Sequence, residues 1–284
     1  MRIFRVLALA AVFALTSGCA SLMSNAASGL ADSLSSGILN HDDPDTVREG
    51  MPSYMIMMDG FVHDNPDDSA MLGAAANLYA SFGAVFVDDP ARASRLTARG
   101  RDYALRAICI DYAVACGWRE TTYDEFVATL DGLDLHHADA VYAYSFATLA
   151  YLRAHSADWN SLAELPQTEA LVKRYLEITG STANSSAHMY LGILLTLMPP
   201  ALGGKPEEAR AHFEKAIALT GGKDLSAKVE FAKGYAKLLY DRELHDRLLV
   251  EVLESDPNVD GRTLSNVLAQ EEALLLQAEA NDYF

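Results

Sequence analysis

The sequence predicts an all-α protein made of stacked antiparallel helix pairs. Apolar side chains recur every three to four positions along most of the chain beyond Asp42, which is the spacing of a helix with one apolar face. Prolines and glycines fall mostly between these periodic runs, and no run alternates apolar and polar residues as a half-buried strand would. We therefore expect about ten or eleven helices with short connections.

The periodic runs are clearest in the second half of the chain. Intervals of three and four place the apolar side chains of each run on one side of a helix, although Glu271 interrupts the last stripe. The four sets are Leu191, Leu194, Leu195 and Met198; Ala209, Phe213, Ala216 and Ile217; Phe231, Tyr235, Leu238 and Leu239; and Leu264, Val267, Leu268, Leu275 and Ala278.

Prolines, glycines and acidic residues mark the expected helix ends. Gly221 and Gly222 predict a helix stop, and Asp224 then stands where an N-cap is favoured. Glu207 and Glu208 suit the first turn of a helix, where the helix dipole favours acids. The prolines between periodic runs are Pro66, Pro90, Pro166, Pro206 and Pro257.

One helix pair has the spacing of a tetratricopeptide repeat. Leu191-Gly192 followed by Ala209, Phe213 and Ala216 resembles the Leu-Gly and Ala-x3-Phe-x2-Ala pattern of such repeats, in which small residues let two helices approach. About five residues are inserted around Pro199 to Leu202, and other pairs match less well. We expect a tetratricopeptide-like helical solenoid rather than a regular array.

The first 18 residues are predicted to be a signal peptide. Arg2 and Arg5 precede an apolar run from Val6 to Leu15, which rises only about 15 Å as a helix and is too short to span a bilayer. The following Thr16-Ser17-Gly18-Cys19 resembles the lipobox of bacterial lipoproteins, which implies that Cys19 carries lipid. The alternative is a chance cysteine at the end of an ordinary signal peptide.

The expected order after cleavage is a lipid-anchored flexible tether at 19–43 and a helical domain at 44–284. Residues 20–41 are rich in Ser, Ala and Gly, but Leu30, Leu34 and Ile38 fall four apart, so part of the tether is alternatively a short helix. In lipoproteins an Asp after the lipidated Cys favours the inner membrane. Ala20 therefore favours the periplasmic face of the outer membrane.

The charge balance excludes one class of partner. Without Arg2 and Arg5, the mature chain has 20 basic and 39 acidic residues, a formal charge of −19. Such a chain repels phosphate backbones, so we expect no nucleic-acid binding.

Cys109 and Cys116 are the two cysteines beyond Cys19. On one continuous helix, seven residues separate them by about 10 Å, which is too far for a disulfide. This spacing favours two small buried hydrophobic residues. A local disulfide requires the helix to break before Gly117.

No catalytic or metal motif is complete in the sequence. Gly204-Lys205 and Gly222-Lys223 lack the other residues of a phosphate-binding loop. His136-His137 between acids is better explained as a helix start capped by Asp134, because adjacent helical residues point apart. The pairs Asp42-Asp43, Asp67-Asp68 and Asp88-Asp89 are most simply solvated turns. We expect no metal, no cofactor and no enzymatic activity.

Aromatic residues cluster in the segment before Trp159. Tyr142, Phe146 and Leu149 share one helix face and are expected in the core. Tyr144 and Tyr151 lie seven apart on another stripe, where they are expected either to line a partner or ligand contact or to belong to the core or surface.

Ordered short segments along almost the whole body, from about Thr46 to Phe284, carry a family resemblance. The chain resembles the T component of TRAP-type transporters (tripartite ATP-independent periplasmic transporters). The segments are Val47 to Tyr54 with Asp59-Gly60, Asn77-Leu78-Tyr79, Ala104 to Ala107, Pro199 to Ala209 with His212 to Ala216, Arg262 to Asn266, and Asn281 to Phe284. The Gly203-Gly204-Lys205-Pro206-Glu207 run is the most specific.

The resemblance implies a non-catalytic periplasmic subunit that forms a homotrimer and binds the solute-binding subunit of the transporter, together with an apolar or organic-acid ligand. We expect Pro199, Pro200, Leu202 and Gly203 to form an apolar loop at the partner-facing edge; the alternative is a stiff connection between helices. A general helical lipoprotein adaptor in envelope assembly is the rival function.

Overall fold

The computed structural model describes residues 33–182 and 184–284. In these ranges the chain forms α-helices, short 3₁₀ helices and one π-helical turn, without any β-strand. The prediction of an all-α protein is therefore confirmed. The predicted signal peptide and Cys19 lie outside the described residues.

The helices follow one another with short connections. The α-helices are α2 Pro44–Asp64, α3 Ser69–Val85, α4 Pro90–Asp111, α5 Tyr123–Leu130, α6 Ala138–Ala154, α7 Trp159–Leu162, α8 Leu165–Thr179, α9 Ser185–Thr196, α10 Pro206–Leu219, α11 Leu225–Glu230, α12 Arg242–Leu253 and α13 Thr263–Tyr283. The shorter elements are the 3₁₀ helices η1 Ala113–Glu120, η2 Leu135–His137 and η3 Pro200–Leu202, and the π-helical turn η4 Phe231–Ala236.

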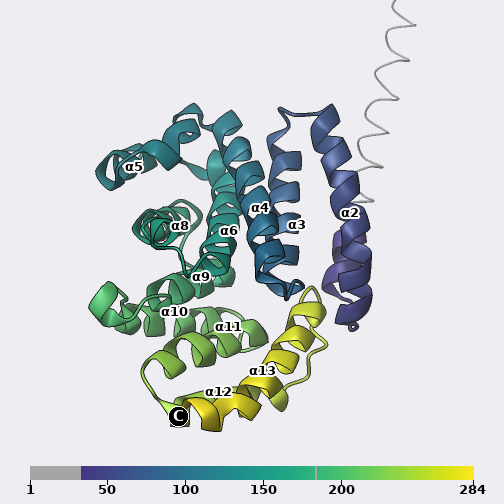
Figure 1. The fold of residues 1–284 in the computed structure, drawn as a ribbon, viewed down its shortest axis with the longest axis vertical. Coiled ribbons are helices and arrows are strands. Elements are labelled where there is room, and N and C mark those ends of the chain that lie inside the picture. The colour runs from purple at the N-terminus through teal and green to yellow at the C-terminus, as the bar shows by residue number, and fades with distance from the viewer. Residues whose placement is uncertain (1–32, 183) are drawn as a thin grey trace, which may run out of the picture.

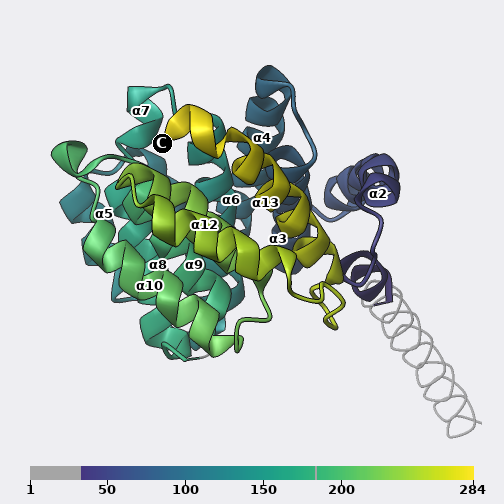
Figure 2. The ribbon, with the colours of Figure 1, turned by 90° about the horizontal axis from the view of Figure 1, so that it is seen from below.

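The helices form two groups that meet at α6 and α9. Figure 1 shows α2, α3, α4 and α6 side by side as upright helices, with α9 to α12 stacked across their lower end. α13 begins near α2, which it contacts, and runs back along this lower stack to the C-terminus (Figures 1 and 2). Most of the buried apolar residues belong to one continuous core.

Paired acids at the ends of loops have a structural role as helix caps. The side chains of Asp43, Asp68 and Asp89 each accept a hydrogen bond from a backbone N–H in the first turn of α2, α3 and α4. Each is the second member of an Asp-Asp pair. These caps explain why α2 and α4 begin at a proline that directly follows Asp.

Two helix pairs approach closely at a glycine. A Cβ atom on Gly100 of α4 would lie 2.9 Å from the backbone nitrogen of Ala80 in α3. A Cβ atom on Gly192 of α9 would lie 2.7 Å from the ring of Phe213 in α10. The second contact is the one that the Leu-Gly and Phe spacing predicts for this pair. That the other helix pairs also stack as a tetratricopeptide-like solenoid stays a prediction.

The prediction for Cys109 and Cys116 was wrong, because the two residues form a disulfide. Helix α4 ends at Asp111, and the chain then turns into η1, which brings the two Cα atoms to 4.7 Å. The turn is fixed by Trp118, which is buried against the rings of Phe126 and Tyr144. Burial of this indole ends the helix before the second cysteine.

The apolar stripe predicted for α13 was also wrong in its last part. Leu275 is 65% exposed, and Ala278 is exposed. The buried face instead carries mostly small residues, namely Ala269, Ala273 and Ala280, with Leu276 between them. Alanines allow α13 to lie close to its neighbours, so the helix is rotated away from the face with the larger leucines.

The described end of the predicted tether is helical rather than extended. Residues 33–39 form a helix, and Ile38 packs against the core. The side-chain oxygen of Asn40 accepts a hydrogen bond of 2.7 Å from the backbone of Gly261, in the loop between α12 and α13. No helix of the described residues has the length and apolar character needed to cross a bilayer.

Candidate functional site

The loop between α9 and α10 has a closely defined backbone. It contains η3 and then Gly203, whose φ of +99° is a conformation that side chains disfavour. Gly204 has no room for a side chain, because a Cβ atom would lie 1.8 Å from the carbonyl oxygen of Met198. Its backbone N–H donates to Pro199, and that of Lys205 donates to Leu195. The backbone conformation therefore favours glycine at position 203, and the lack of space for a side chain requires glycine at position 204.

An ion-pair cluster holds the end of this loop against α8. The Lys205 ammonium lies 2.8 Å from the Glu169 carboxylate, which also pairs with Lys173 at 2.7 Å. Burial disfavours ionisation of Glu169, but hydrogen bonds from Lys173 and Lys205 outweigh this effect and lower its pKa. The next residue, Pro206, begins α10. Both ends of the loop are thus fixed by neighbouring helices.

The tip of the α9–α10 loop is apolar and open to solvent. Pro199, Pro200 and Gly203 are exposed, and the Leu202 side chain is 54% exposed. The structure therefore brings the four predicted loop residues together on one rigid projection. This arrangement suits a contact surface that needs little ordering when a partner binds.

The two tyrosines predicted as contacts lie elsewhere, on α6. Tyr144 is buried and packs against Trp118, as the core alternative expects. Tyr151 is half-buried, stacks on His155 with ring centroids 4.0 Å apart, and bonds to Ser161. The ring and hydrogen-bond contacts of both tyrosines go to α4, α6, α7 and η1 rather than to the α9–α10 loop.

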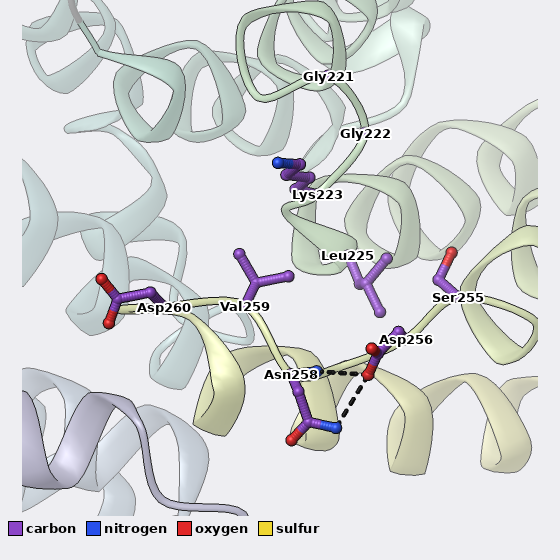
Figure 3. Close-up of a pocket in the computed structure, with 9 residues that line it drawn as sticks. All are labelled: Gly221, Gly222, Lys223, Leu225, Ser255, Asp256, Asn258, Val259 and Asp260. Atoms are coloured by element: carbon purple, nitrogen blue, oxygen red, sulfur yellow. Dashed lines mark hydrogen bonds between the residues drawn. The ribbon is translucent and has the colours of Figure 1, made fainter.

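A hollow of about 600 Å³ lies between the turn joining α10 to α11 and the loop joining α12 to α13. Figure 3 shows Lys223 on the side of the first turn and Asp256, Asn258 and Asp260 on the side of the second loop. The other residues that line the hollow are Gly221, Gly222, Leu225, Ser255 and Val259. The hollow therefore combines one cation, two carboxylates and an apolar surface.

A smaller hollow of about 220 Å³ adjoins the first and shares Lys223 and Val259 with it. It is lined further by three hydroxyl-bearing residues, an arginine and a leucine, namely Thr182, Ser185, Thr220, Arg262 and Leu219. The two hollows thus differ in charge: both acids lie in the larger one, and the second cation lies in the smaller one.

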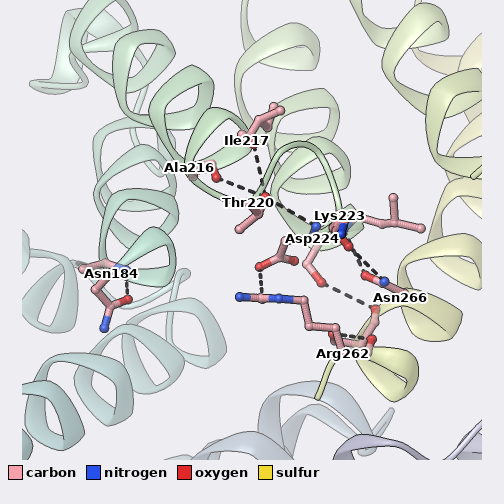
Figure 4. A network of polar contacts seen from close by, with 12 residues as sticks. Asn184, Ala216, Ile217, Thr220, Lys223, Asp224, Arg262 and Asn266 are labelled. Carbon is pink, nitrogen blue, oxygen red and sulfur yellow. Dashed lines mark hydrogen bonds and ion pairs between the residues drawn. The ribbon is translucent and has the colours of Figure 1, made fainter. Parts of the chain in front are cut away.

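Asn266 joins the two sides of these hollows (Figure 4). Its fully buried side chain accepts a hydrogen bond of 3.0 Å from the backbone of Leu225 and donates to the carbonyl oxygens of Lys223 and Pro257. A buried amide that satisfies three backbone groups stabilises both loops at once. In the sequence, Asn266 stands out only as the end of the family-like segment Arg262 to Asn266, and no pattern there indicates its contacts.

Asp224 precedes α11 at the predicted N-cap position, but its side chain makes no cap hydrogen bond. Its carboxylate instead pairs with the Arg262 guanidinium at 2.6 Å (Figure 4). Asn266 supplies the acceptor for the first backbone N–H of α11. Asn266, rather than the predicted Asp224, therefore caps the start of α11.

The α12–α13 loop is held by further side chains. Gln270 donates to the carbonyl oxygens of Val252 and Ser255, at 3.1 and 2.8 Å. Asp256 accepts hydrogen bonds from the backbone and side chain of Asn258, which lower its pKa and keep it ionised.

Several histidines make contacts that stabilise turns and helix ends. Asp134 caps η2 through the backbone of His136, as the helix-start interpretation predicts. An unpredicted pair joins Nδ1 of His188 and Nδ1 of His212 at 2.9 Å, while Nε2 of His188 bonds to the carbonyl oxygen of Ser181. No group of three or more His, Cys, Asp or Glu residues in the described ranges is arranged to hold a metal ion.

Comparison with family models decides the relationship of the chain. The model of the TRAP transporter T-component matches residues 40–284, which is almost the whole described structure. The chain belongs to the TRAP transporter T-component family. This T-component carries the family-like Gly203-Gly204-Lys205-Pro206 segment in the rigid loop described above. No curated protein matches the chain.

Proposed function

We propose that this T-component is a non-catalytic, lipid-anchored subunit of a TRAP-type uptake system, and that it binds the periplasmic solute-binding subunit through the tip of its α9–α10 loop. Family membership supports association with a TRAP system. The observation that carries the docking proposal is the rigid loop that holds Pro199, Pro200 and Leu202 exposed. A preorganised apolar tip binds at low entropic cost.

A matched pair of substitutions tests the docking surface. Leu202→Asp places a charge on the loop tip, whereas Leu274→Asp places one on α13, where the leucine is 57% exposed. We expect Leu202→Asp to abolish co-purification of the solute-binding subunit from envelope extracts and Leu274→Asp to leave it unchanged. Equal recovery with both variants would contradict the loop proposal. Recovery of outer-membrane assembly proteins instead would support the rival adaptor function.

The anchor and the oligomer are further parts of the proposal. We propose that the chain is exported, carries lipid on Cys19 and is held at the periplasmic face of the outer membrane as a homotrimer. Cys19→Ser is expected to move the protein from the membrane fraction to the soluble periplasmic fraction. Light scattering of the detergent-purified protein is expected to give three times the chain mass, after subtraction of detergent.

A further inference from the structure

The joined hollows, which are the two that share Lys223 and Val259, form a cavity that the docking proposal does not use. Their combined lining includes two basic residues, two carboxylates and several hydroxyl-bearing residues from three separate segments of the chain. Side chains from distant segments, Asn266 above all, hold the cavity walls in place. The walls are therefore preformed, which is the usual property of small-molecule sites.

Lys223 is the charged residue that lines both hollows, and Val259 is the apolar one. The Lys223 side chain is exposed, and its ammonium has no ion pair with an acid of the described residues. The three described lysines in and beside α10 differ in their partners. Lys205 is paired with Glu169, whereas Lys215 and Lys223 have no ion pair with a described acid. Lys223 differs from Lys215 because it faces a cavity.

The smaller hollow is suited to a single negative charge. Lys223 contributes one positive charge there, whereas Asp224 neutralises much of the charge of Arg262. The Arg262 contact with Asp224 uses Nη1, and a guanidinium has further donors on its other nitrogens. Thr182, Ser185 and Thr220 line the same hollow, and the Thr220 hydroxyl also bonds to the backbone of Ile217 and Asp224. One net positive charge matches a carboxylate better than a doubly charged phosphate.

The larger hollow is suited to hydrogen-bond donors on a ligand. Asp256 and Asp260 are acceptors when ionised, and Ser255 adds a hydroxyl. Two acids would repel a second anionic group at this end. Leu225 and Val259 add an apolar surface beside these acceptors. The charge difference between the hollows therefore orients a ligand, with its anionic end at Lys223.

We propose that the joined hollows bind a small carboxylate whose body carries hydroxyl or ammonium donors, with the carboxylate beside Lys223 and Arg262 and the donors facing Asp256 and Asp260. This inference deepens the proposed function in solute uptake and rests on it for its biological role. The binding itself is a property of the purified chain and is measured without any partner.

Three probes with the same number of carbon atoms test separately whether binding needs the carboxylate and whether it needs the hydroxyl donors. Gluconate has a carboxylate and hydroxyls, sorbitol lacks the carboxylate, and hexanoate lacks the hydroxyls. We expect saturable binding of gluconate to the full lipoprotein in detergent by calorimetry. Sorbitol and hexanoate are each expected to bind at least about tenfold more weakly, because each lacks one set of charge-assisted hydrogen bonds. Equal binding of the three probes, no saturable binding of gluconate, or tighter binding of inorganic phosphate would overturn the proposal.

Substitutions then locate the site. Lys223→Gln is expected to weaken gluconate binding by about tenfold or more, whereas Lys215→Gln, which removes the same charge from an exposed position on α10, leaves it within about twofold. Asp260→Ala removes a negative charge and would strengthen binding if only net charge mattered. The proposal requires weaker binding of gluconate to this variant, and stronger binding would overturn it.

The two proposals fail in different ways. Loss of gluconate binding in Lys223→Gln with normal co-purification of the solute-binding subunit supports both. Gluconate binding by a protein that recovers no solute-binding subunit overturns the docking function and leaves the cavity assignment standing. Circular dichroism of each variant confirms that its helices are retained.

Discussion

The α9–α10 loop and the α12–α13 loop belong to the same stacked half of the molecule but are fixed in different ways. The first is fixed locally, by the backbone of Gly203 and Gly204 and by its own hydrogen bonds. The second is fixed from a distance, by Asn266, Gln270 and Asn40. A loop fixed by its own backbone can expose its side chains, whereas a loop fixed by distant side chains encloses space.

The largest expected effect tests the local rigidity of the first loop. Gly204→Ala forces a methyl group against the Met198 carbonyl oxygen, so the backbone must move. We expect a loss of about 3 kcal/mol or more of unfolding free energy in urea. Gly60→Ala is the control, because a Cβ there meets nothing within 4 Å and alanine favours the helix. Similar stability of both variants would show that the loop adapts.

The second effect tests whether a distant side chain fixes the other loop. Asn266→Ala leaves the backbone N–H of Leu225 and two carbonyl oxygens without their partner. We expect a loss of about 2 kcal/mol in urea unfolding. Hydrogen exchange at Leu225 is expected to accelerate, while exchange at Lys205 stays unchanged. Unchanged exchange at Leu225 would argue against this coupling.

A smaller effect concerns the ion pairs beside the first loop and depends on pH. The folded-state pKa of Glu169 is lowered, so its stabilising contribution is present above the unfolded pKa and is lost as pH falls through the folded one. Glu169→Gln is expected to cost about 1 kcal/mol at neutral pH, measured by urea unfolding. The difference from the wild type should vanish in acid. The exposed Glu207→Gln is the control, and a difference independent of pH would contradict the assignment.

The smallest effect tests the contact between Asn40 and the second loop. Asn40→Ala removes the acceptor for the Gly261 N–H at an exposed site. We expect a loss of about 0.5 kcal/mol, with faster hydrogen exchange confined to Gly261 and its neighbours. Faster exchange throughout α13 would show that the contact supports the helix rather than the loop alone.

The sequence predicts features that depend on neighbouring residues. Pro90 and Pro206 begin helices, and Gly221 and Gly222 end one with positive φ angles, as their residue types indicate. The candidate docking loop was found in the same way, because its glycines and prolines are adjacent in the chain.

Features that depend on distant packing were missed. Cys109 and Cys116 meet because burial of Trp118 ends α4 early, which no helical spacing reveals. The joined hollows need Asn266 to meet the backbone of Lys223, 43 positions away. In the last part of α13 the buried residues are Ala269, Ala273, Leu276 and Ala280. The weak apolar signal of the alanines was outweighed by exposed leucines such as Leu275.

The disulfide has a practical consequence for every measurement on purified material. Thiols stay reduced in the bacterial cytosol and are oxidised outside it. A copy folded in the cytosol would carry Cys109 and Cys116 as free thiols, and the segment that holds Trp118 would lose its covalent clamp. Two preparations of the same sequence would then differ in how firmly η1 is attached to α4. Mass spectrometry of each batch shows whether the disulfide has formed, and this should be known before stability or binding is compared.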